Sequence, residues 1–394
     1  MREVRTQVVI VGAGPAGLVL GHLLHLQGVD NIVLERRTRD YVEHRQRAGV
    51  LEYGITEMLA EAGVGERMRR EGLAHHGIQL RFENGAHRIN FLELADGRAI
   101  TVYGQQEVVK DLIGLRLNFH GAALHFESEV RAIEGIDTER PFVDANTPEG
   151  PLRIHAAYVA GCDGTHGVTG QSVPALVRRR FERVYPFAWL GILAQAAPVN
   201  DELIYSRHER GFALYSMRSP ELVRLYLGVA PDENLADWSD ERIWDELATR
   251  LGEGAHGQLQ TGPILERGIT AMRNIVLEPL RHGRLVLAGD AAHIVPPTGA
   301  KGMNLALADV RVLVPALVAA LRENDTRLLD AYSDTCLRHV WRAEEFSTYM
   351  TQMLHPNPHD EFENRVQLAR LRQVVESEPT ARALARHYVD ACSL

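Results

Sequence analysis

Residues 7–35 constrain the fold of this chain more than any other stretch. They read QVVIVGAGPAGLVLGHLLHLQGVDNIVLE, a strand, a glycine-rich turn, a helix and a second strand. The β-branched run Val8–Val11 is typical of a parallel strand that is buried on both faces. Gly12, Gly14 and Gly17 have the GxGxxG spacing of a turn that receives a dinucleotide pyrophosphate at a helix N-terminus. The stretch therefore predicts an α/β domain of the Rossmann-like type.

Each glycine of such a turn has its own task. The first makes the turn, the second lets the backbone approach the pyrophosphate, and the third lets the helix pack closely. Glu35 follows the second strand, where a carboxylate can accept hydrogen bonds from the ribose hydroxyls of an adenosine. The spacing alone is compatible with NAD and with FAD.

Two later segments repeat the design of a buried strand that ends at an acidic residue. YVAGCDG places Asp163 after one apolar run, and RLVLAGDAAH places Asp290 after another. Ligands of open α/β sheets bind at the carboxyl ends of strands, so both carboxylates are expected to converge with the glycine turn on one crevice. Each segment taken singly also fits an ordinary Asp-Gly turn or a helix cap. Three such segments in one chain favour the shared crevice.

Composition excludes several other classes of function. A net charge of -9 argues against nucleic-acid binding, which needs basic patches. The three cysteines are widely separated, and neither HExxH nor GxSxG occurs, so no metal site and no serine nucleophile is expected. No apolar run is expected to reach the roughly 20 residues of a membrane span, and the N-terminus begins with a strand pattern. We expect a cytoplasmic protein without nucleic-acid or membrane partners.

A two-residue period marks the segments GFALYSMRS and LVRLYLGV. Alternate residues of a strand share a face, so Ser216 lies beside Arg218, and Arg224 lies beside Tyr226. A guanidinium and hydroxyls on an otherwise apolar face suit one small carboxylate ligand. An ordinary exposed sheet face is the alternative interpretation.

The stretches GAGPAG, AGCDG and GRLVLAGDAAHIVPPTGAKGMN together resemble the signatures of the class A flavoprotein monooxygenases. Within that family the chain is similar to the enzymes that act on 4-hydroxybenzoate, through RAGVLE, TVYGQ, FERVYPF and DWSDER. The resemblance implies FAD as cofactor, with O₂ and either NADPH or NADH as co-substrates. It implies hydroxylation of this aromatic acid at the 3-position, through a C4a-hydroperoxyflavin, to 3,4-dihydroxybenzoate in aromatic catabolism. A related flavin hydroxylase that acts on another para-substituted or hydroxylated benzoate is the alternative.

The resemblance also implies roles for individual residues. Tyr205 and Tyr388 would draw off the phenolic proton, and His75 would pass it to solvent. The residues expected to contact the substrate are Tyr205, Ser216, Met217, Arg218, Tyr226, Pro297 and Thr298. Those expected to contact FAD are Gly12, Gly14, Ala16, Gly17, Glu35, Arg45, Gln46, Arg47, Ala48, Gly49, Val50, Gln105, Asp163, Arg224, Asp290, Gly302, Met303 and Asn304.

The nicotinamide cofactor is expected near Arg36, Arg37, Tyr41, His166 and Arg273. Arg36 and Arg37 suit the 2′-phosphate of NADPH, because guanidinium groups pair well with phosphate. Gly170 stands where better-known members of the family carry an arginine, so NADPH and NADH both stay open.

Pattern and resemblance together predict a discontinuous α/β architecture. The FAD-binding domain would comprise residues 1–73, 103–178 and 271–320. An inserted mixed-sheet α+β substrate domain would comprise residues 74–102 and 179–270. A helical C-terminal region, residues 321–394, would contribute to the core or to the interface of a homodimer.

Two rival functions follow from the same motifs. A NAD-dependent dehydrogenase would use GAGPAG for the nicotinamide cofactor itself, and would leave the two later aspartate segments unexplained. A binding protein with the flavin fold but no redox turnover would leave the polar cluster of Tyr205, Ser216, Arg218 and Tyr388 without a task.

Overall fold

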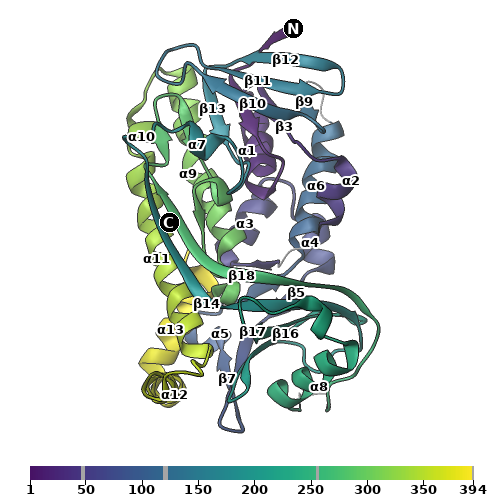
Figure 1. Cartoon of the computed structure of the whole chain (residues 1–394). Helices are drawn as coiled ribbons and strands as arrows, with labels where there is room; N and C mark the ends of the chain where they lie inside the picture. Colours follow the sequence, from purple (N-terminus) through teal and green to yellow (C-terminus); the bar gives the residue numbers. More distant parts are fainter. Residues whose placement is uncertain (46–48, 119–122, 254–256, 393–394) are drawn as a thin grey trace.

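The computed structural model describes residues 1–45, 49–118, 123–253 and 257–392 of the 394-residue chain. Figure 1 shows an elongated molecule with the N-terminal strands at one end and a large sheet at the other. The long strands β14 (Arg179–Gln195) and β18 (Ile264–Glu278) run between the two ends, beside helix α11 (Tyr332–Leu354).

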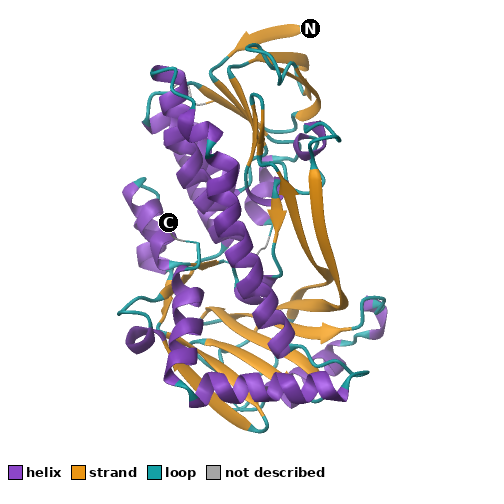
Figure 2. Cartoon of the chain, turned by 90° about the vertical axis from the view of Figure 1, so that its left-hand side faces the viewer, coloured by secondary structure: helices purple, strands orange, loops and turns teal. Residues whose placement is uncertain are grey.

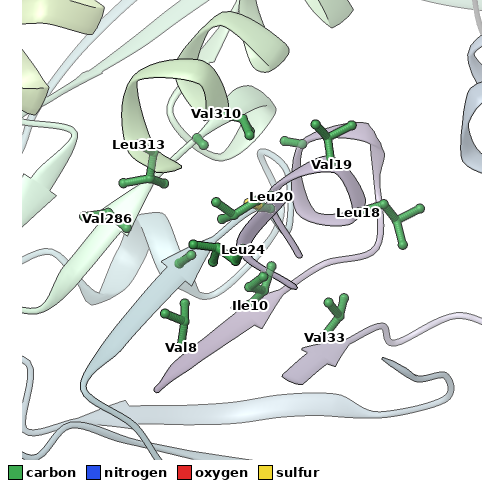
Figure 3. Close-up of a cluster of buried hydrophobic side chains, with 14 of the residues drawn as sticks. Val8, Ile10, Leu18, Val19, Leu20, Leu24, Val33, Val286, Val310 and Leu313 are labelled. Carbon is green, nitrogen blue, oxygen red and sulfur yellow. The ribbon is translucent and has the colours of Figure 1, made fainter. Parts of the chain in front are cut away.

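A six-stranded sheet contains the glycine-rich turn. The strand order is β19-β20-β13-β2-β3-β9, and every neighbouring pair is parallel except β19 with β20. The helix α1 (Pro15–Leu26) follows the turn and packs on the sheet (Figure 3). The predicted Rossmann-like sheet is thus confirmed. Its strands are β2 (Val8–Val11), β3 (Asn31–Leu34), β9 (Ala123–His125), β13 (Tyr158–Gly161), β19 (Arg281–His282) and β20 (Leu285–Leu287).

An eight-stranded sheet forms the other end of the molecule, in the order β21-β18-β14-β17-β16-β15-β6-β7. Its neighbours are antiparallel except β15 with β6. On β16, Ala213 and Tyr215 pack under helix α8 (Asp240–Leu251), whereas Phe212 and Leu214 pack in the core on the opposite face. The predicted two-residue period is therefore present up to Met217, but an irregularity at Arg218 interrupts the pairing of β16 with β17. The remaining strands are β6 (Gly77–Phe82), β7 (Gly85–Asn90), β15 (Leu203–His208), β16 (Gly211–Ser219), β17 (Leu222–Val229) and β21 (His293–Ile294).

The remaining strands form two smaller sheets. One has the order β1-β12-β11-β10, and the other has the order β4-β8-β5. These strands are β1 (Arg2–Arg5), β4 (Val50–Leu51), β5 (Leu73–His75), β8 (Ile100–Val102), β10 (Glu129–Glu134), β11 (Phe142–Thr147) and β12 (Gly150–His155). Short helices connect them: α2 (Arg39–His44), α3 (Tyr53–Glu61), α4 (Glu66–Glu71), α5 (Phe91–Leu94), α6 (Gln105–Asn118), α7 (Thr169–Ser172) and α10 (Arg327–Asp330), with 3₁₀ turns η1 (Leu235–Asp237), η2 (Gly289–Ala291) and η3 (Pro297–Gly299).

The C-terminal region is helical, as predicted. Helices α12 (Glu361–Glu376) and α13 (Glu378–Asp390) share a buried core with the eight-stranded sheet and with α11. Figure 2 shows these helices lying over strands at the lower end of the molecule. The chain end is thereby brought against a sheet built from residues much earlier in the sequence.

Helix α9 (Gly302–Arg322) corrects one expectation from the sequence. Its length of 21 residues and its mean hydropathy of 1.8 are sufficient to cross a membrane, so such an apolar run does exist. In the fold, 67% of its most apolar window is buried, and the helix packs against α1 and α11. Its apolar character is explained by the core.

Candidate active site

A cavity of about 470 Å³ opens where β2, β3, β13 and β20 end. The glycine turn, Asp163 and Asp290 all line it, so the structure brings the three sequence segments together. Of the other residues expected to contact FAD, the cavity wall includes Ala16, Glu35, Arg45, Gln105, Gly302 and Met303.

The three glycines of the turn meet different constraints. Gly12 has φ +105°, and a Cβ there would lie 2.3 Å from the carbonyl oxygen of Cys162. At Gly17 a Cβ would lie 1.9 Å from the carbonyl oxygen of Gly12, so α1 can approach the turn only without a side chain. At Gly14, a Cβ would meet no atom of the described residues within 4 Å, and the residue lines the cavity. The open space at Gly14 is where a pyrophosphate fits against the helix N-terminus.

Glu35 is held at the edge of this cavity by two backbone groups. Its Oε2 accepts a hydrogen bond from the Ala13 N–H at 2.9 Å, and its Oε1 accepts one from the Arg37 N–H at 2.8 Å. The carboxylate is therefore oriented before a ligand arrives, at the position where a ribose would donate to it.

The two aspartates of the later segments differ. The carboxylate of Asp163 accepts hydrogen bonds from both the backbone N–H and the hydroxyl of Thr169, so it anchors the start of α7. Burial raises the pKa of Asp163, and the bonds from Thr169 oppose that shift. Asp290 is exposed on the cavity wall. Its carboxylate is the one placed to bond hydroxyls of a ligand.

A buried network behind Gly289 holds the turn that presents Asp290. Asp309 on α9 accepts from the Gly289 N–H at 2.9 Å, and the same oxygen lies 2.6 Å from Nε2 of His293. Burial opposes the protonation of His293, but the carboxylate of Asp309 outweighs it and raises the pKa of the imidazole. The sequence predicts neither role, because the partner of each side chain becomes known only from the fold.

Several residues expected to contact FAD lie elsewhere. Gln46, Arg47 and Ala48 fall outside the described residues. Gly17, Gly49, Val50, Arg224 and Asn304 are described but are not part of the cavity wall. The Asn304 amide donates to the carbonyl of Val50 at 2.9 Å and accepts from the Glu52 N–H at 2.8 Å, so its side chain ties α9 to β4.

Tyr205 on β15 and Tyr388 on α13 meet with their hydroxyl oxygens 2.5 Å apart. Both side chains are about 1% exposed. Burial raises the pKa of each phenol, so both stay protonated at neutral pH. In the sheet, Tyr205 is opposite Leu214, which is opposite Tyr226, so these three side chains share one face.

Arg218 lies on β16, four residues beyond Leu214. Its side chain is part-buried, and its Nη1 is fully buried with no hydrogen-bond partner in the described part of the chain. Burial lowers the pKa of this guanidinium. A buried guanidinium nitrogen without a partner is costly, so the arrangement fits an anionic ligand that supplies the missing oxygen. Ser216, on the same strand, is 1% exposed.

The neighbouring residues shape the space around these polar groups. Arg224 Nε donates to the Tyr226 hydroxyl at 3.3 Å. A Cβ at Gly191 would lie 3.2 Å from the Tyr226 ring, so the glycine leaves room for that ring. Thr298 is fully buried and accepts from the Thr351 hydroxyl at 2.9 Å, while Pro297 begins the same 3₁₀ turn. Met217 is half-buried on β16.

His75, on β5, is 1% exposed, and both of its ring nitrogens are buried without a partner among the described residues. Burial lowers the pKa of His75 to about 4, so the ring is neutral at pH 7. A neutral imidazole with two unused nitrogens can pass a proton from one side to the other through intervening water.

A buried ion pair lies between the dinucleotide cavity and the Tyr205–Tyr388 pair. Lys301 Nζ is 2.6 Å from Glu52 Oε1, and both side chains are 1% exposed. Lys301 also donates to the backbone carbonyl of Tyr388, and Glu52 accepts from the Cys392 N–H. The sequence showed Lys301 only as a charge in a loop rich in glycine and proline, because the partner is 249 residues away.

Most, but not all, of the residues expected to bind the nicotinamide cofactor line the same cavity. Arg36, Arg37, Tyr41 and His166 line the cavity, and the first three also line an adjoining groove of about 540 Å³. Arg273 lies on β18 and contributes to neither.

Comparison with known proteins agrees with this geometry. Residues 5–347 match the model of the FAD binding domain family. The chain is 42% identical to p-hydroxybenzoate hydroxylase of Acinetobacter baylyi over 99% of this chain and 96% of that protein. It is 27% identical to dialkyldecalin synthase of Streptomyces rugosporus, over 83% of this chain and 68% of that protein.

The fold is also known from a crystal structure of p-nitrophenol 4-monooxygenase from Pseudomonas putida. The TM-score is 0.81 at 19% identity, and the alignment covers 98% of this chain and 97% of that one. By its family match and its full-length similarity, this chain belongs to the FAD binding domain family, among the FAD-dependent aromatic hydroxylases of the class A flavoprotein monooxygenases.

Proposed function

We propose that this protein hydroxylates 4-hydroxybenzoate at the 3-position to give 3,4-dihydroxybenzoate. The reaction consumes O₂ and NADPH or NADH and releases water, within the breakdown of aromatic compounds. The observation that carries the proposal is the pairing of an unsatisfied guanidinium, Arg218, with the Tyr205–Tyr388 hydroxyl pair in one buried region.

The two polar ends match the two ends of this substrate. Arg218 lies four residues beyond Leu214 on β16, at an irregularity in the strand pairing, and Leu214 is opposite Tyr205. Long side chains that reach inward from such positions leave room for a benzene ring with a para substituent. Arg218 and Ser216 would bind the carboxylate, and Tyr205 would bind the phenol.

The tyrosine pair would withdraw the phenolic proton. Tyr205 would accept a hydrogen bond from the substrate hydroxyl while its own proton moves toward Tyr388, so neither residue has to hold a charge for long. His75 would then pass the proton toward solvent. A phenolate ring is more electron-rich than a phenol, which makes the carbon next to the oxygen more reactive toward an electrophilic oxygen atom.

The cavity residues support FAD as the bound group. The open backbone at Gly14 would receive the pyrophosphate, Glu35 the ribose, and Asp290 the hydroxyls beyond. The backbone of Gly302 and Met303, at the start of α9, would face the flavin with the positive end of the helix dipole. Bound FAD supplies the hydride acceptor and the activation of O₂.

The oligomeric state and the cellular location of the protein are also part of the proposed function. We propose a cytoplasmic homodimer that uses the C-terminal helical region, where Phe362 is an exposed large apolar side chain. Size-exclusion chromatography with light scattering measures the mass in solution.

The test of substrate identity is a product assay across benzoates, with both nicotinamides. We expect 4-hydroxybenzoate to stimulate oxidation of NADPH or NADH strongly and to yield 3,4-dihydroxybenzoate. Benzoates whose para substituent carries no donatable proton should stimulate less, because they cannot donate a hydrogen bond to Tyr205. A protein that binds FAD but shows no stimulation with any hydroxybenzoate would contradict the substrate assignment.

The same assay tests the tyrosine pair. Tyr205→Phe should still oxidise the nicotinamide in the presence of substrate, but product formation should slow by about 100-fold, the usual contribution of one proton transfer. The excess reducing power should appear as hydrogen peroxide. Tyr215→Phe is the matched control, because Tyr215 is equally buried but lies on the opposite face of the sheet. Unchanged coupling in Tyr205→Phe would remove its assigned role.

A further inference from the structure

A separate cavity, of about 560 Å³, lies between the strands β14 and β18 and the helices α11 and α12. It shares no lining residue with the dinucleotide cavity. In Figure 1 this region is where the two long strands pass alongside α11. Its walls include three aromatic rings, those of Phe181, Trp341 and Tyr349.

The inner wall of this cavity carries two unpaired acceptors. Glu344 is 4% exposed and accepts from Nδ2 of Asn274 through its Oε2. The same Nδ2 donates to the Thr348 hydroxyl at 3.2 Å. Glu344 Oε1 and Asn274 Oδ1 are buried, and within the described ranges neither has a hydrogen-bond partner. A buried acceptor without a partner destabilises the fold, so the pair is the unusual feature of this wall.

We propose that this cavity is a second ligand site, which binds a small aromatic cation of the amidinium or guanidinium type. On binding, Glu344 Oε1 and Asn274 Oδ1, which are buried without a ligand, would turn toward the cavity and accept from two N–H groups of the cation. The two side chains are already joined by a hydrogen bond. The ring would pack against Trp341, Tyr349 and Phe181, whose faces also attract positive charge. The site lies outside the proposed aromatic hydroxylation and does not depend on it.

The charges around the cavity favour a cation over an anion. The lining contains three carboxyl groups, Glu182, Glu344 and Glu345, against two guanidinium groups, Arg183 and Arg370. An anionic ligand would face two acceptors and gain no donor from them. A neutral amide could satisfy both acceptors, but it would leave the charge of Glu344 uncompensated.

The raised pKa of Glu344 also favours a cationic ligand. Burial raises its pKa to about 7, against the opposing effects of the bond from Asn274 and the charge of His293 on β21. Glu345 lies on the same helix, Glu182 and Arg183 face the cavity from β14, and Arg370 faces it from α12. A cation pairs with the ionised carboxylate, so its binding displaces the proton.

The experiment is calorimetric titration of the FAD-loaded protein with benzamidine, which stays cationic throughout the pH range used. One molecule should bind per chain. The affinity should rise about tenfold from pH 6 to pH 8, because the ligand competes with a proton on a group of pKa about 7. Benzamide, a neutral molecule of the same shape, should bind at least tenfold more weakly.

Glu344→Gln should weaken benzamidine binding at least tenfold and remove its pH dependence. Glu345→Gln is the matched control, since this neighbouring carboxyl is exposed at the cavity mouth, and it should change the affinity less than threefold. If Glu344→Gln does not fold, proton release from the unmodified protein serves instead: about one proton per benzamidine at pH 6 and none at pH 8.5. Absent binding, equal affinity for benzamide, or an unaffected Glu344→Gln would overturn the proposal.

Discussion

Hydrogen bonds from two sides determine the protonation state of His355. Trp189 Nε1 donates to Nε2 of the ring at 2.7 Å, and Nδ1 lies 2.8 Å from the carbonyl oxygen of Thr351. A carbonyl can only accept, so Nδ1 carries the ring proton and Nε2 has none. Burial lowers the pKa of His355 to about 3, although the bond to Thr351 opposes the shift. The ring stacks on Phe187 and Phe212, beside the proposed substrate site.

The protein should therefore lose stability in acid through this residue. The unfolded chain binds a proton at His355 near pH 6.5, whereas the folded chain binds it only near pH 3. Between these values the free energy of unfolding falls by about 1.4 kcal/mol per pH unit, or about 2 kcal/mol by pH 5. Urea unfolding at pH 7.5 and pH 5 measures the loss.

His355→Gln should be less stable at pH 7.5 but should show a shallower dependence on pH. His359→Gln, an exposed histidine four residues away, should keep the dependence of the unmodified protein. Equal slopes for the unmodified protein and His355→Gln would show that another group carries the acid sensitivity.

The turn between β2 and α1 is the element on which cofactor binding depends. Its backbone is crowded on the inner side, where Gly17 approaches Gly12, and open on the outer side, where Gly14 faces the cavity. The fold requires glycine at positions 12 and 17, where the backbone is crowded. Ligand binding requires glycine at position 14, where the backbone faces the cavity. Substitution can separate the two requirements.

Gly14→Ala should fold as well as the unmodified chain, because Gly14 has φ -76° and an added Cβ meets open space. Its affinity for FAD should fall at least tenfold, since the methyl group occupies the space of the pyrophosphate. Gly17→Ala should instead destabilise the protein without cofactor by several kcal/mol, because its Cβ would overlap the Gly12 carbonyl.

Flavin fluorescence titration and thermal unfolding of the cofactor-free protein measure the two effects. Gly114→Ala in α6 is the control, because an added Cβ there also meets open space and the residue is not part of the cavity wall. Normal FAD affinity in Gly14→Ala would contradict the proposed course of the pyrophosphate.

At the scale of the whole molecule, the Lys301–Glu52 ion pair connects segments that are far apart in the sequence. Glu52 follows β4, Lys301 precedes α9, and their remaining bonds reach Tyr388 and Cys392 near the end of the chain. Three distant parts of the sequence thus meet at one buried charge pair between the cofactor cavity and the tyrosines.

Removing one partner of this pair should be more harmful than removing both. Glu52→Gln or Lys301→Met alone should lower the free energy of unfolding by about 3 to 5 kcal/mol, because each leaves a buried charge without its partner. The double variant should recover at least about 2 kcal/mol of the expected sum. Urea unfolding of the four proteins measures the coupling.

The half-buried pair Lys110–Glu107, at the surface, is the control for this cycle. Lys110→Met should change the free energy of unfolding by less than about 1 kcal/mol, since this pair is in contact with water. Additive losses in the Lys301–Glu52 cycle would mean that the two side chains do not depend on each other.

The dinucleotide turn, the two aspartate segments and most of the alternating faces of the substrate sheet could be predicted from the sequence alone. These features are local, because strand period, turn chemistry and glycine spacing act within a few residues of each other. The convergence of Asp163, Asp290 and the turn also followed from a general rule, since parallel strands end at one edge of a sheet.

Which polar groups become partners could not be predicted from the sequence and is known from the fold. Tyr205 meets Tyr388 across 183 residues, Lys301 meets Glu52 across 249, and Glu344 meets Asn274 across 70. The fold also shows that the carboxylate of Asp163 is taken up by Thr169, and that Arg224 and Asn304 lie outside the cavity wall. Burial and hydrogen-bond satisfaction depend on the packing of distant segments, and no local pattern in the chain records that packing.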